Sequence, residues 1–452
     1  MLTLSQDIKK LNELDKKHYL HPASSPKAQI QQGPKLIFSE GKGIHVTDIK
    51  GDTYIDGVSM LWNVNVGHGQ KELADIAHQQ MSKLAFGSSF FGFSNEPAIR
   101  LAEKIASIAP GDLNSIFYTS GGSESNDTAV KLARFYWSLK GKPQKLKIIS
   151  LRNGYHGVTI GAQTLTGIDA FNVFSGSKAY DVLHATPHLT NCELGDKTDP
   201  NYESSIRAVL EREGAETIAA IIIEPVQGAG GVHICPPGYL QAVRKLCNEN
   251  EVLFIADEVI CGFGRTGTMF GVENWDVVPD LMSVAKGITS GYAQLGGVLI
   301  RDEIKEEIAQ YEYPLAHGFT YSGHPTACAV GLKNIELIER YNLVANTKIM
   351  EQELMAGLKY LESKHSIVTK TRALGLLAAF DLMADRDNGV PFDPTLMAPY
   401  VVCEESFTRK LLVRGSGNTI ILSPPLIINK NEIEEMITIL DDSITAFKKT
   451  LG

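Results

Sequence analysis

One lysine of the sequence stands out because it ends an apolar segment. Lys286 follows Leu-Met-Ser-Val-Ala and precedes Gly287, so we expect it at the end of a buried strand. Most lysines lie at the surface, because removing an ammonium group from water costs free energy. A desolvated lysine has a lowered pKa and is a nucleophilic amine that forms imines. Lys286 is therefore the first candidate for catalysis.

Two acidic residues end other predicted strands. Asp257 closes the apolar run Val252–Asp257, and Glu224 closes Ile218–Glu224. A carboxylate at the C-terminal end of a buried strand lies over the crevice where α/β sheets bind ligands. Asp257 could hold a protonated ring nitrogen there by a charge-assisted hydrogen bond. For a single acid, however, a helix cap or a structural ion pair is the more common role.

Two glycine-rich segments suit a planar, phosphorylated ligand. Thr119–Thr128 opens a predicted helix with glycines and serines, whose free backbone N–H groups and helix dipole attract a phosphate. An ordinary capped helix has the same pattern. Tyr155 lies between glycines in Asn153–Gly157 and could stack on a planar ring. His156 beside it is more often a structural residue than a catalyst.

A third glycine-rich segment, Gly262–Gly267, matches the G-x-G-x-x-G pattern of dinucleotide-binding folds. In those folds a helix follows the glycines. Here the chain continues as Thr-Met-Phe-Gly-Val-Glu-Asn-Trp, without a helical period and with Pro279 soon after. We therefore expect no dinucleotide site at this segment.

The composition indicates a soluble globular protein. The chain has 452 residues, of which 43% are hydrophobic and 21% charged, and its net charge is −9. Because Lys and Arg form no long cluster, nucleic acid and anionic membranes are unexpected partners. The six cysteines form no C-x-x-C pair, which argues against a zinc site or a disulfide framework. Dispersed thiols and the absence of an apolar secretory signal predict a cytoplasmic protein, and we expect no metal site.

Short apolar strands alternate with helical patterns through the middle of the chain. This alternation predicts an α/β fold whose mainly parallel central sheet is covered by helices on both faces. The predicted strands are Lys147–Ser150, Ile218–Glu224, Val252–Asp257, Leu281–Ala285 and Gly297–Ile300, and the predicted helices are Lys71–Ala85, Pro97–Ile108, Glu124–Lys140 and Gly238–Asn250.

The C-terminal third predicts a smaller α/β domain, in which apolar residues of the last helix recur at steps of three and four. A hairpin-like segment, Gly43–Gly57, belongs to this domain or to a dimer interface. We expect a large domain at residues 61–322 and a small domain built from residues 1–60 and 323–452. The predicted elements of the C-terminal third are the helices Pro325–Tyr341, Asn346–Lys364 and Glu432–Lys449 and the strand Gly375–Leu382.

A phosphate loop, an aromatic residue, an acid and a lysine follow one another in a specific order. In this order the sequence resembles the class III, or omega, aminotransferases, which are fold-type I enzymes dependent on pyridoxal 5′-phosphate (PLP). The resemblance covers nearly the whole chain, from about Asp15 to the end. The motifs that carry it are LWNVNVGHG, SGGSESNDT, NGYHG, IIIEPVQGAGG, ADEVICGFGRTG, SVAKG, FTYSGHP and VRGSGNTIILSPPL.

The resemblance implies roles for five residues around the cofactor ring. Lys286 resembles the Schiff-base lysine, and Asp257 resembles the acid that pairs with the pyridine nitrogen. Tyr155 resembles the residue stacked on one face of the ring, and Val259 the residue packed on the other. Glu224 resembles the acid that supports the Asp257 region. Lys286, Asp257 and Tyr155 are thus the expected catalytic residues.

The resemblance also implies how the cofactor phosphate is bound. Gly122 and Ser123 resemble the phosphate loop, and Thr320 resembles a threonine that reaches the phosphate from the neighbouring subunit. We therefore expect a homodimer, or a dimer of such dimers. Trp62 and Arg414 match substrate-pocket positions of the omega aminotransferases.

Phe90 and Phe91 are expected to approach the partner's substrate pocket. Arg414 could clamp a carboxylate with two hydrogen bonds, or swing aside for an amine without one. The resemblance thus implies an omega-amine or omega-amino acid:2-oxo acid aminotransferase with pyruvate as acceptor. It would follow a ping-pong mechanism through pyridoxamine phosphate.

The nearest alternative is the adenosylmethionine-8-amino-7-oxononanoate aminotransferase (diaminopelargonate synthase) of biotin biosynthesis. RNGYHG and the His21-Pro22 region are similar to that enzyme, and Arg265 is retained but is shared across much of the family. Leu61, however, replaces the first of its two adjacent tryptophans. Ala23, Val158 and Ile421 stand where it has tyrosine, aspartate and tyrosine. Apolar groups thus replace the polar and aromatic contacts that its substrates need, which favours the omega-amine interpretation.

Two other classes stay open. The same fold serves PLP-dependent decarboxylases, and a regulator could keep the cofactor site without turnover. Such regulators usually carry a DNA-binding module, and the sequence contains no spare basic domain.

Overall fold

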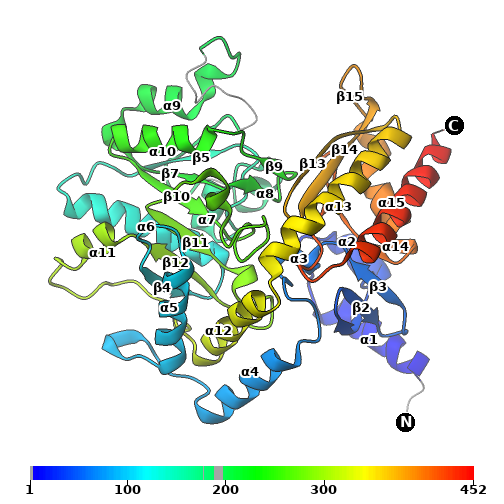
Figure 1. The fold of residues 1–452 in the computed structure, drawn as a ribbon, viewed down its shortest axis with the longest axis horizontal. Helices are drawn as coiled ribbons and strands as arrows, with labels where there is room; N and C mark the ends of the chain where they lie inside the picture. The colour runs from blue at the N-terminus through cyan, green and yellow to red at the C-terminus, as the bar shows by residue number, and fades with distance from the viewer. Residues whose placement is uncertain (1–3, 177, 188–196, 452) are drawn as a thin grey trace.

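The computed structural model describes residues 4–176, 178–187 and 197–451, and its elements form two groups (Figure 1). A seven-stranded sheet with its helices makes up one group. A four-stranded and a five-stranded sheet with long C-terminal helices make up the other. Among the described residues, no helix has both the length and the apolar character needed to cross a bilayer.

The central sheet is mainly parallel, as the alternation of strands and helices predicts. One strand, β12, runs antiparallel to both of its neighbours, whereas the other pairings are parallel. Two of its strands, β4 (Ser115–Thr119) and β6 (Val182–Ala185), are not among the strands predicted from the sequence. The order across the sheet is β4 (Ser115–Thr119), β12 (Gly296–Ile300), β11 (Leu281–Val284), β10 (Leu253–Asp257), β7 (Ile218–Ile223), β5 (Lys147–Leu151) and β6 (Val182–Ala185).

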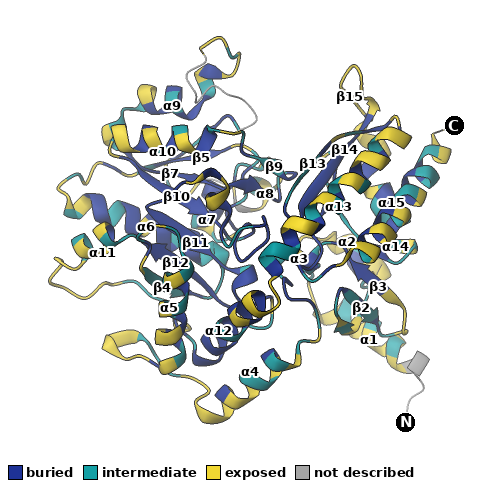
Figure 2. Ribbon diagram, viewed as in Figure 1, coloured by how far each residue is buried: buried dark blue, intermediate teal, exposed yellow. Residues whose placement is uncertain are grey.

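Helices cover both faces of this sheet (Figure 2), so its strands β7, β10, β11 and β12 are buried at every residue, whereas the edge strands β4 and β6 are partly exposed. All six residues of β7 are buried, and its last three residues alternate between two apolar clusters, with Ile221 and Ile223 in one and Ile222 in the other. The covering helices include α5 (Glu96–Ile108), α6 (Gly122–Leu139), α9 (Ile206–Glu213), α10 (Tyr239–Glu249) and α11 (Asp302–Ile308). Short helices α7 (Ile160–Leu165) and α8 (Asp169–Ser175) follow β5.

The second group combines both ends of the chain. Hairpin strands β2 and β3 pair on either side of Gly51, and β3 also pairs in parallel with β16, which joins the N-terminal segment to the C-terminal third. The four-stranded sheet contains β1 (Phe38–Lys42), β2 (His45–Asp48), β3 (Thr53–Asp56) and β16 (Leu411–Leu412). The five-stranded sheet contains β13 (Val368–Leu374), β14 (Leu377–Asp385), β15 (Val390–Pro391), β17 (Arg414–Ser416) and β18 (Thr419–Leu422).

Long helices complete this group. Helix α15 (Lys430–Thr450) begins at a capping box between Asn429 and Glu432, and its predicted apolar positions are buried. Helix α13 (Leu343–Lys364) packs on β13, and α14 (Ala398–Thr408) packs on α15. Helix α12 (Pro325–Arg340) contacts α4 (Lys71–Lys83) and α5 instead, although it follows the expected boundary at residue 322. The domain boundaries stay a prediction.

Candidate active site

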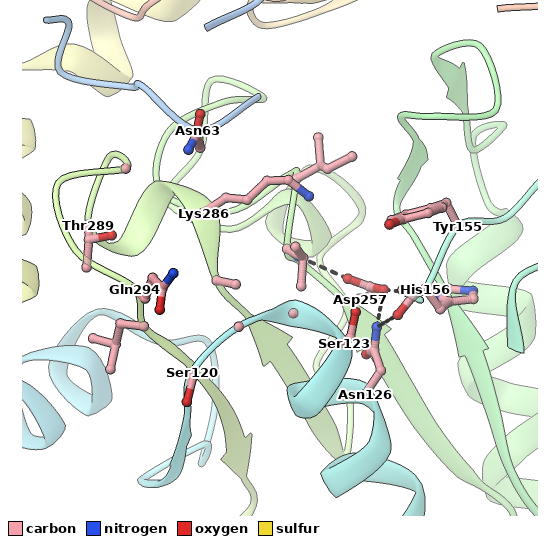
Figure 3. A pocket seen from close by; sticks show the side chains of 18 of the residues that line it. Asn63, Ser120, Ser123, Asn126, Tyr155, His156, Asp257, Lys286, Thr289 and Gln294 are labelled. Atoms are coloured by element: carbon pink, nitrogen blue, oxygen red, sulfur yellow. Dashed lines mark hydrogen bonds and ion pairs between the residues drawn. The ribbon is translucent and has the colours of Figure 1, made fainter. Parts of the chain in front are cut away.

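A cavity of about 450 Å³ lies at the C-terminal ends of the central strands and contains most of the predicted cofactor residues (Figure 3). The strands β7, β10 and β11 end beside it, and α6 begins at its wall. The side chain of Lys286 extends across the cavity toward Tyr155. Seven predicted residues line it: Gly122, Ser123, Tyr155, Glu224, Asp257, Val259 and Lys286.

Lys286 lies two residues beyond the end of β11, after Ala285, and begins the short turn η6 (Lys286–Ile288). Its φ of +44° is unusual for a residue with a side chain and directs the chain sharply away from the strand. Burial lowers the pKa of Lys286, while the charges of Asp257 and Glu224 oppose this shift. The lysine is thus a desolvated amine beside two carboxylates, as a nucleophile or proton carrier requires.

Asp257 ends β10 and is held by three donors. Its Oδ2 accepts a hydrogen bond from Nδ2 of Asn126 at 2.7 Å and lies 2.8 Å from Nδ1 of His156, which donates to it. Its Oδ1 accepts from the backbone N–H of Val259 at 3.1 Å. The carboxylate is therefore fixed in orientation before any ligand binds.

The roles of Asn126 and His156 at this carboxylate were not predicted from the sequence. Asn126 also donates to the carbonyl oxygen of His156 at 2.7 Å, so the two residues hold each other as well as Asp257. They come from α6 and from the loop after β5, far apart in the chain. One signal was available: Asn126 is three residues after Ser123, so both lie on the same face of α6.

Glu224 lies just beyond β7 and supports the Tyr155 loop. It is only 3% exposed, and its oxygens accept from the backbone N–H groups of Tyr155 at 2.8 Å and Gly228 at 3.1 Å. Burial raises the pKa of Glu224, while His156 lowers it and Asp257 raises it. The contact fixes the backbone that carries the aromatic ring of Tyr155.

The start of α6 forms a tight cradle of backbone N–H groups. A Cβ atom on Gly122 would lie 2.9 Å from Val259, and one on Gly157 would lie 2.4 Å from Oγ of Ser123. The hydroxyl of Ser123 accepts from the backbone N–H of Val158 at 3.1 Å. Only glycine fits at these positions, and the 18-residue helix directs its positive end at the cavity. The cradle suits a phosphate group.

Together these residues fit a phosphorylated pyridine aldehyde. The helix start matches its phosphate, Tyr155 its ring face, Asp257 a protonated ring nitrogen and Lys286 its aldehyde carbon. Figure 3 shows these four groups arranged around one space.

Trp62 and Arg414 meet beside this cavity, although they come from opposite ends of the chain. The guanidinium carbon of Arg414 lies 4.5 Å from the ring centroid of Trp62. Arg414 lines a second cavity, of about 600 Å³, next to α14. Burial lowers the pKa of Arg414, and the nearby Tyr155 opposes this shift. Among the described residues, neither the guanidinium nor the buried indole N–H of Trp62 has a hydrogen-bond or ion-pair partner.

Phe90, Phe91 and Thr320 lie outside both cavities of this chain. Phe90 and Phe91 belong to the turn η1 (Phe90–Gly92), and the side chain of Phe91 is 92% exposed. Thr320 is also exposed, in the loop before α12. Phe90 packs close to this loop, because a Cβ on Gly318 would lie 2.8 Å from its ring. The three residues therefore share one exposed region.

Comparison with known proteins identifies relatives over almost the full chain. The family model of class-III aminotransferases matches residues 27–444. The chain is 38% identical to a putrescine–pyruvate aminotransferase of Pseudomonas aeruginosa, across 94% of each chain. It is 36% identical to a diaminobutyrate–2-oxoglutarate transaminase of Halomonas elongata, across 95% of this chain and 94% of that one.

Solved structures of transaminases are also similar to this chain over almost its full length. A transaminase from the marine bacterium Virgibacillus is 50% identical, with a TM-score of 0.94 over 98% of this chain and 100% of that one. An (S)-enantioselective omega-transaminase from Thermomicrobium roseum is 39% identical, with a TM-score of 0.92 over 97% of this chain and 98% of that one.

Proposed function

The chain belongs to the class III aminotransferase family, and from that premise we propose that it transfers an amino group from an omega-amine or omega-amino acid to a 2-oxo acid, with pyruvate as acceptor. The protein is a PLP-dependent aminotransferase of α/β fold. Two relatives support the proposed substrates: one is named for putrescine and pyruvate, and another is an omega-transaminase.

The observation that carries the proposal is the guanidinium of Arg414 on the ring of Trp62. It is a partly buried cation without an acidic partner among the described residues, so a carboxylate ligand would satisfy it. The indole N–H of Trp62 is a second unpaired donor at the same place. A 2-oxo acid brings such a carboxylate, whereas a simple amine donor does not.

PLP supplies an electrophilic aldehyde and a ring that accepts electrons. Nζ of Lys286 would hold the aldehyde end of the cofactor, and as a free amine it would carry a proton to and from the substrate carbon. Asp257 holds a proton on the ring nitrogen, while Asn126 and His156 keep its carboxylate in place. Tyr155 and Val259, which both line the cavity, would cover the two faces of the ring. The backbone N–H groups at the start of α6 bind the phosphate.

We infer that the active form is a homodimer. Thr320 lies at the surface of its own chain, outside the cavity that contains Gly122 and Ser123. Phe91 and Phe93, 92% and 66% exposed, lie in the region of Thr320 with Phe90, and exposed aromatic groups of this kind favour contact with another chain. A second copy that covers this region would bring its Thr320 to the phosphate.

A donor panel tests the substrate proposal. The holoenzyme is incubated with pyruvate and putrescine, 4-aminobutyrate, 1-phenylethylamine or S-adenosylmethionine, and alanine formation is measured. We expect alanine with at least one of the first three amines. Alanine formation with none of them would contradict the proposal, and an activity confined to S-adenosylmethionine with 8-amino-7-oxononanoate as acceptor would favour the biotin pathway.

A further inference from the structure

The turn that presents Trp62 has a costly backbone. Within Ser59–Trp62 (α3), φ is +46° at Ser59, +55° at Met60 and +59° at Trp62. These left-handed conformations disfavour every residue except glycine, because Cβ approaches the backbone. Three of the four residues in this turn have a positive φ, and such a costly backbone is stable only where surrounding contacts hold it.

Asp56 supplies one set of these contacts. Its two carboxylate oxygens accept from the backbone N–H of Met60 at 2.8 and 2.9 Å. The side chain is fully buried, and Nε2 of His68 lies 2.8 Å from its Oδ2. The start of the turn is therefore fixed to β3, which Asp56 ends.

Ser59 supplies the second set through its hydroxyl. Its Oγ donates to the carbonyl oxygen of Ser423 at 2.7 Å and accepts from Nη2 of Arg265 at 2.9 Å. Ser59 is completely buried, so both bonds form away from water. A glycine would relieve the strained φ but would lose both bonds. The two hydrogen bonds of its hydroxyl thus hold Ser59 in a backbone conformation that serine disfavours.

Arg265 connects this hydroxyl to three parts of the fold. Its fully buried guanidinium also donates to Oδ1 of Asn65 at 2.9 Å, and to the carbonyl oxygens of Leu376 at 3.2 Å and Pro424 at 2.5 Å. No carboxylate lies within ion-pair distance of it in the part of the chain that the structure describes. Its direct acceptors are therefore neutral oxygens from the Trp62 segment and the C-terminal third, while burial lowers the pKa of Arg265 and the charge of Asp56 opposes this shift.

The same contacts place Trp62 relative to the lysine. Ser59 and Asn65 flank Trp62 on both sides in the chain, and Arg265 binds both. Asn65 in turn packs against Gly287, where a Cβ would lie 2.6 Å from its Nδ2. Gly287 directly follows Lys286. The hydrogen bonds of Ser59 and Arg265 thus join the Trp62 turn to the segment that follows β18, which is the strand paired with Arg414, and the packing of Asn65 adds a contact to the residue after Lys286.

We propose that Ser59 is a positioning residue of the substrate pocket: its hydroxyl, between Arg265 and Ser423, holds Trp62 beneath the guanidinium of Arg414. The proposal rests on the proposed function, in which Arg414 on Trp62 binds the acceptor carboxylate. Ser59 itself touches neither substrate nor cofactor. Its loss should impair acceptor binding and leave the chemistry at Lys286 intact.

The test uses holoenzyme carrying Ser59→Ala or Ser59→Gly. Both variants lose the hydroxyl, and glycine also removes the strain, so it guards against a failure to fold. Ser443→Ala is the matched control, because Ser443 is equally buried and its hydroxyl bonds only within α15, to the carbonyl oxygen of Ile439 at 2.6 Å. KM for pyruvate, kcat and the rate of the donor half-reaction are measured for each.

We expect KM for pyruvate to rise roughly five- to thirtyfold in both Ser59 variants, as the loss of buried hydrogen bonds predicts. The donor half-reaction and the Ser443→Ala enzyme should stay close to wild type. A second readout does not depend on turnover: the part of the fluorescence that Trp62→Phe removes should become more accessible to acrylamide in the Ser59 variants.

Three results separate the possible failures. If Ser59→Gly keeps the wild-type KM and the wild-type quenching of Trp62, the positioning role of Ser59 is wrong. If Trp62→Phe and Arg414→Ala leave KM for pyruvate unchanged, the proposed carboxylate site itself fails, whatever Ser59 does to the fluorescence. An equal loss in both half-reactions of Ser59→Ala and Ser59→Gly would show a general structural role and overturn the proposal.

Discussion

Nδ1 of His156 lies 2.8 Å from Oδ2 of Asp257, and both side chains are buried beside the cavity. With Asn126 on the same oxygen, the contact fixes the direction in which the carboxylate faces the cofactor ring. An acid that must hold a proton on a ring nitrogen needs such a fixed position, because the stabilisation that it gives depends on the alignment of its carboxylate with the N–H of the ring.

Asp257→Asn should therefore remove most of the activity while the protein stays folded. Asparagine keeps the size of the side chain but loses the charge that balances a protonated ring. Loss of a buried charge partner costs about 3–4 kcal/mol, or two to three decades in kcat. Asp381→Asn is a suitable control, since Asp381 is a buried acid bound to Arg372 and Thr419 away from the cavity. Equal kcat values for Asp257→Asn and wild type would contradict the assigned role.

The next residue, Glu258, predicts a pH dependence of stability. It is fully buried, and its carboxyl oxygens accept from the backbone N–H groups of Gly271 at 2.8 Å and Val272 at 2.7 Å. Burial raises the pKa of Glu258 from its usual 4.5 to about 8, and the two hydrogen bonds only partly offset this. The folded protein then binds a proton that the unfolded chain has lost.

The free energy of unfolding should consequently fall as pH rises from 4.5 to about 8, with a slope of at most about 1.4 kcal/mol per pH unit from this group. Glu258→Gln cannot titrate and should show a flatter profile. Thermal unfolding of both proteins at about pH 5 and about pH 8.5 measures the difference. Identical profiles would mean that Glu258 does not change its protonation on unfolding.

The strand ends were predictable, because apolar runs close with a polar residue. Asp257 is the last residue of its strand, as its sequence pattern predicts, whereas Glu224 lies one residue and Lys286 two residues beyond the strands that they were expected to end. The partners of Asp257 were not predictable. Asn126 and His156 contact it from separate segments, and no local sequence pattern indicates which distant side chains come together in the fold. The left-handed turn Ser59–Trp62 was also not predicted, because it contains no glycine, the residue that usually indicates a positive φ.

Arg414→Ala should damage the two half-reactions unequally. Pyruvate loses a charge-assisted contact worth about 2–4 kcal/mol, or roughly two to three decades in kcat/KM. An amine without a carboxylate makes no such contact and should react at nearly the original rate. Single-turnover spectra separate the halves, because the aldehyde and amine forms of the cofactor absorb differently. Arg409→Ala serves as control, since Arg409 pairs with Glu405 within α14. Equal losses in both halves would assign Arg414 to the fold or to the cofactor.

Thr320 should act across a subunit interface. Sedimentation of the holoenzyme should show a dimer or a larger assembly, and Thr320→Ala should weaken PLP binding without changing the fold. Removal of one hydroxyl contact to a phosphate should cost about 1.5–3 kcal/mol, or roughly one to two decades in the dissociation constant. A monomer that keeps PLP and full activity would contradict the interface.

Borohydride reduction of the holoenzyme tests the central claim, that Lys286 is the residue bound to the cofactor. Proteolysis and mass spectrometry should then find the pyridoxyl group on Lys286. The most informative competitor is Lys145, whose burial lowers its pKa to about 8 but whose Nζ donates to the carbonyl oxygens of Ala215, Ile218 and Glu251. A label on Lys145, or on any lysine other than Lys286, would contradict the account.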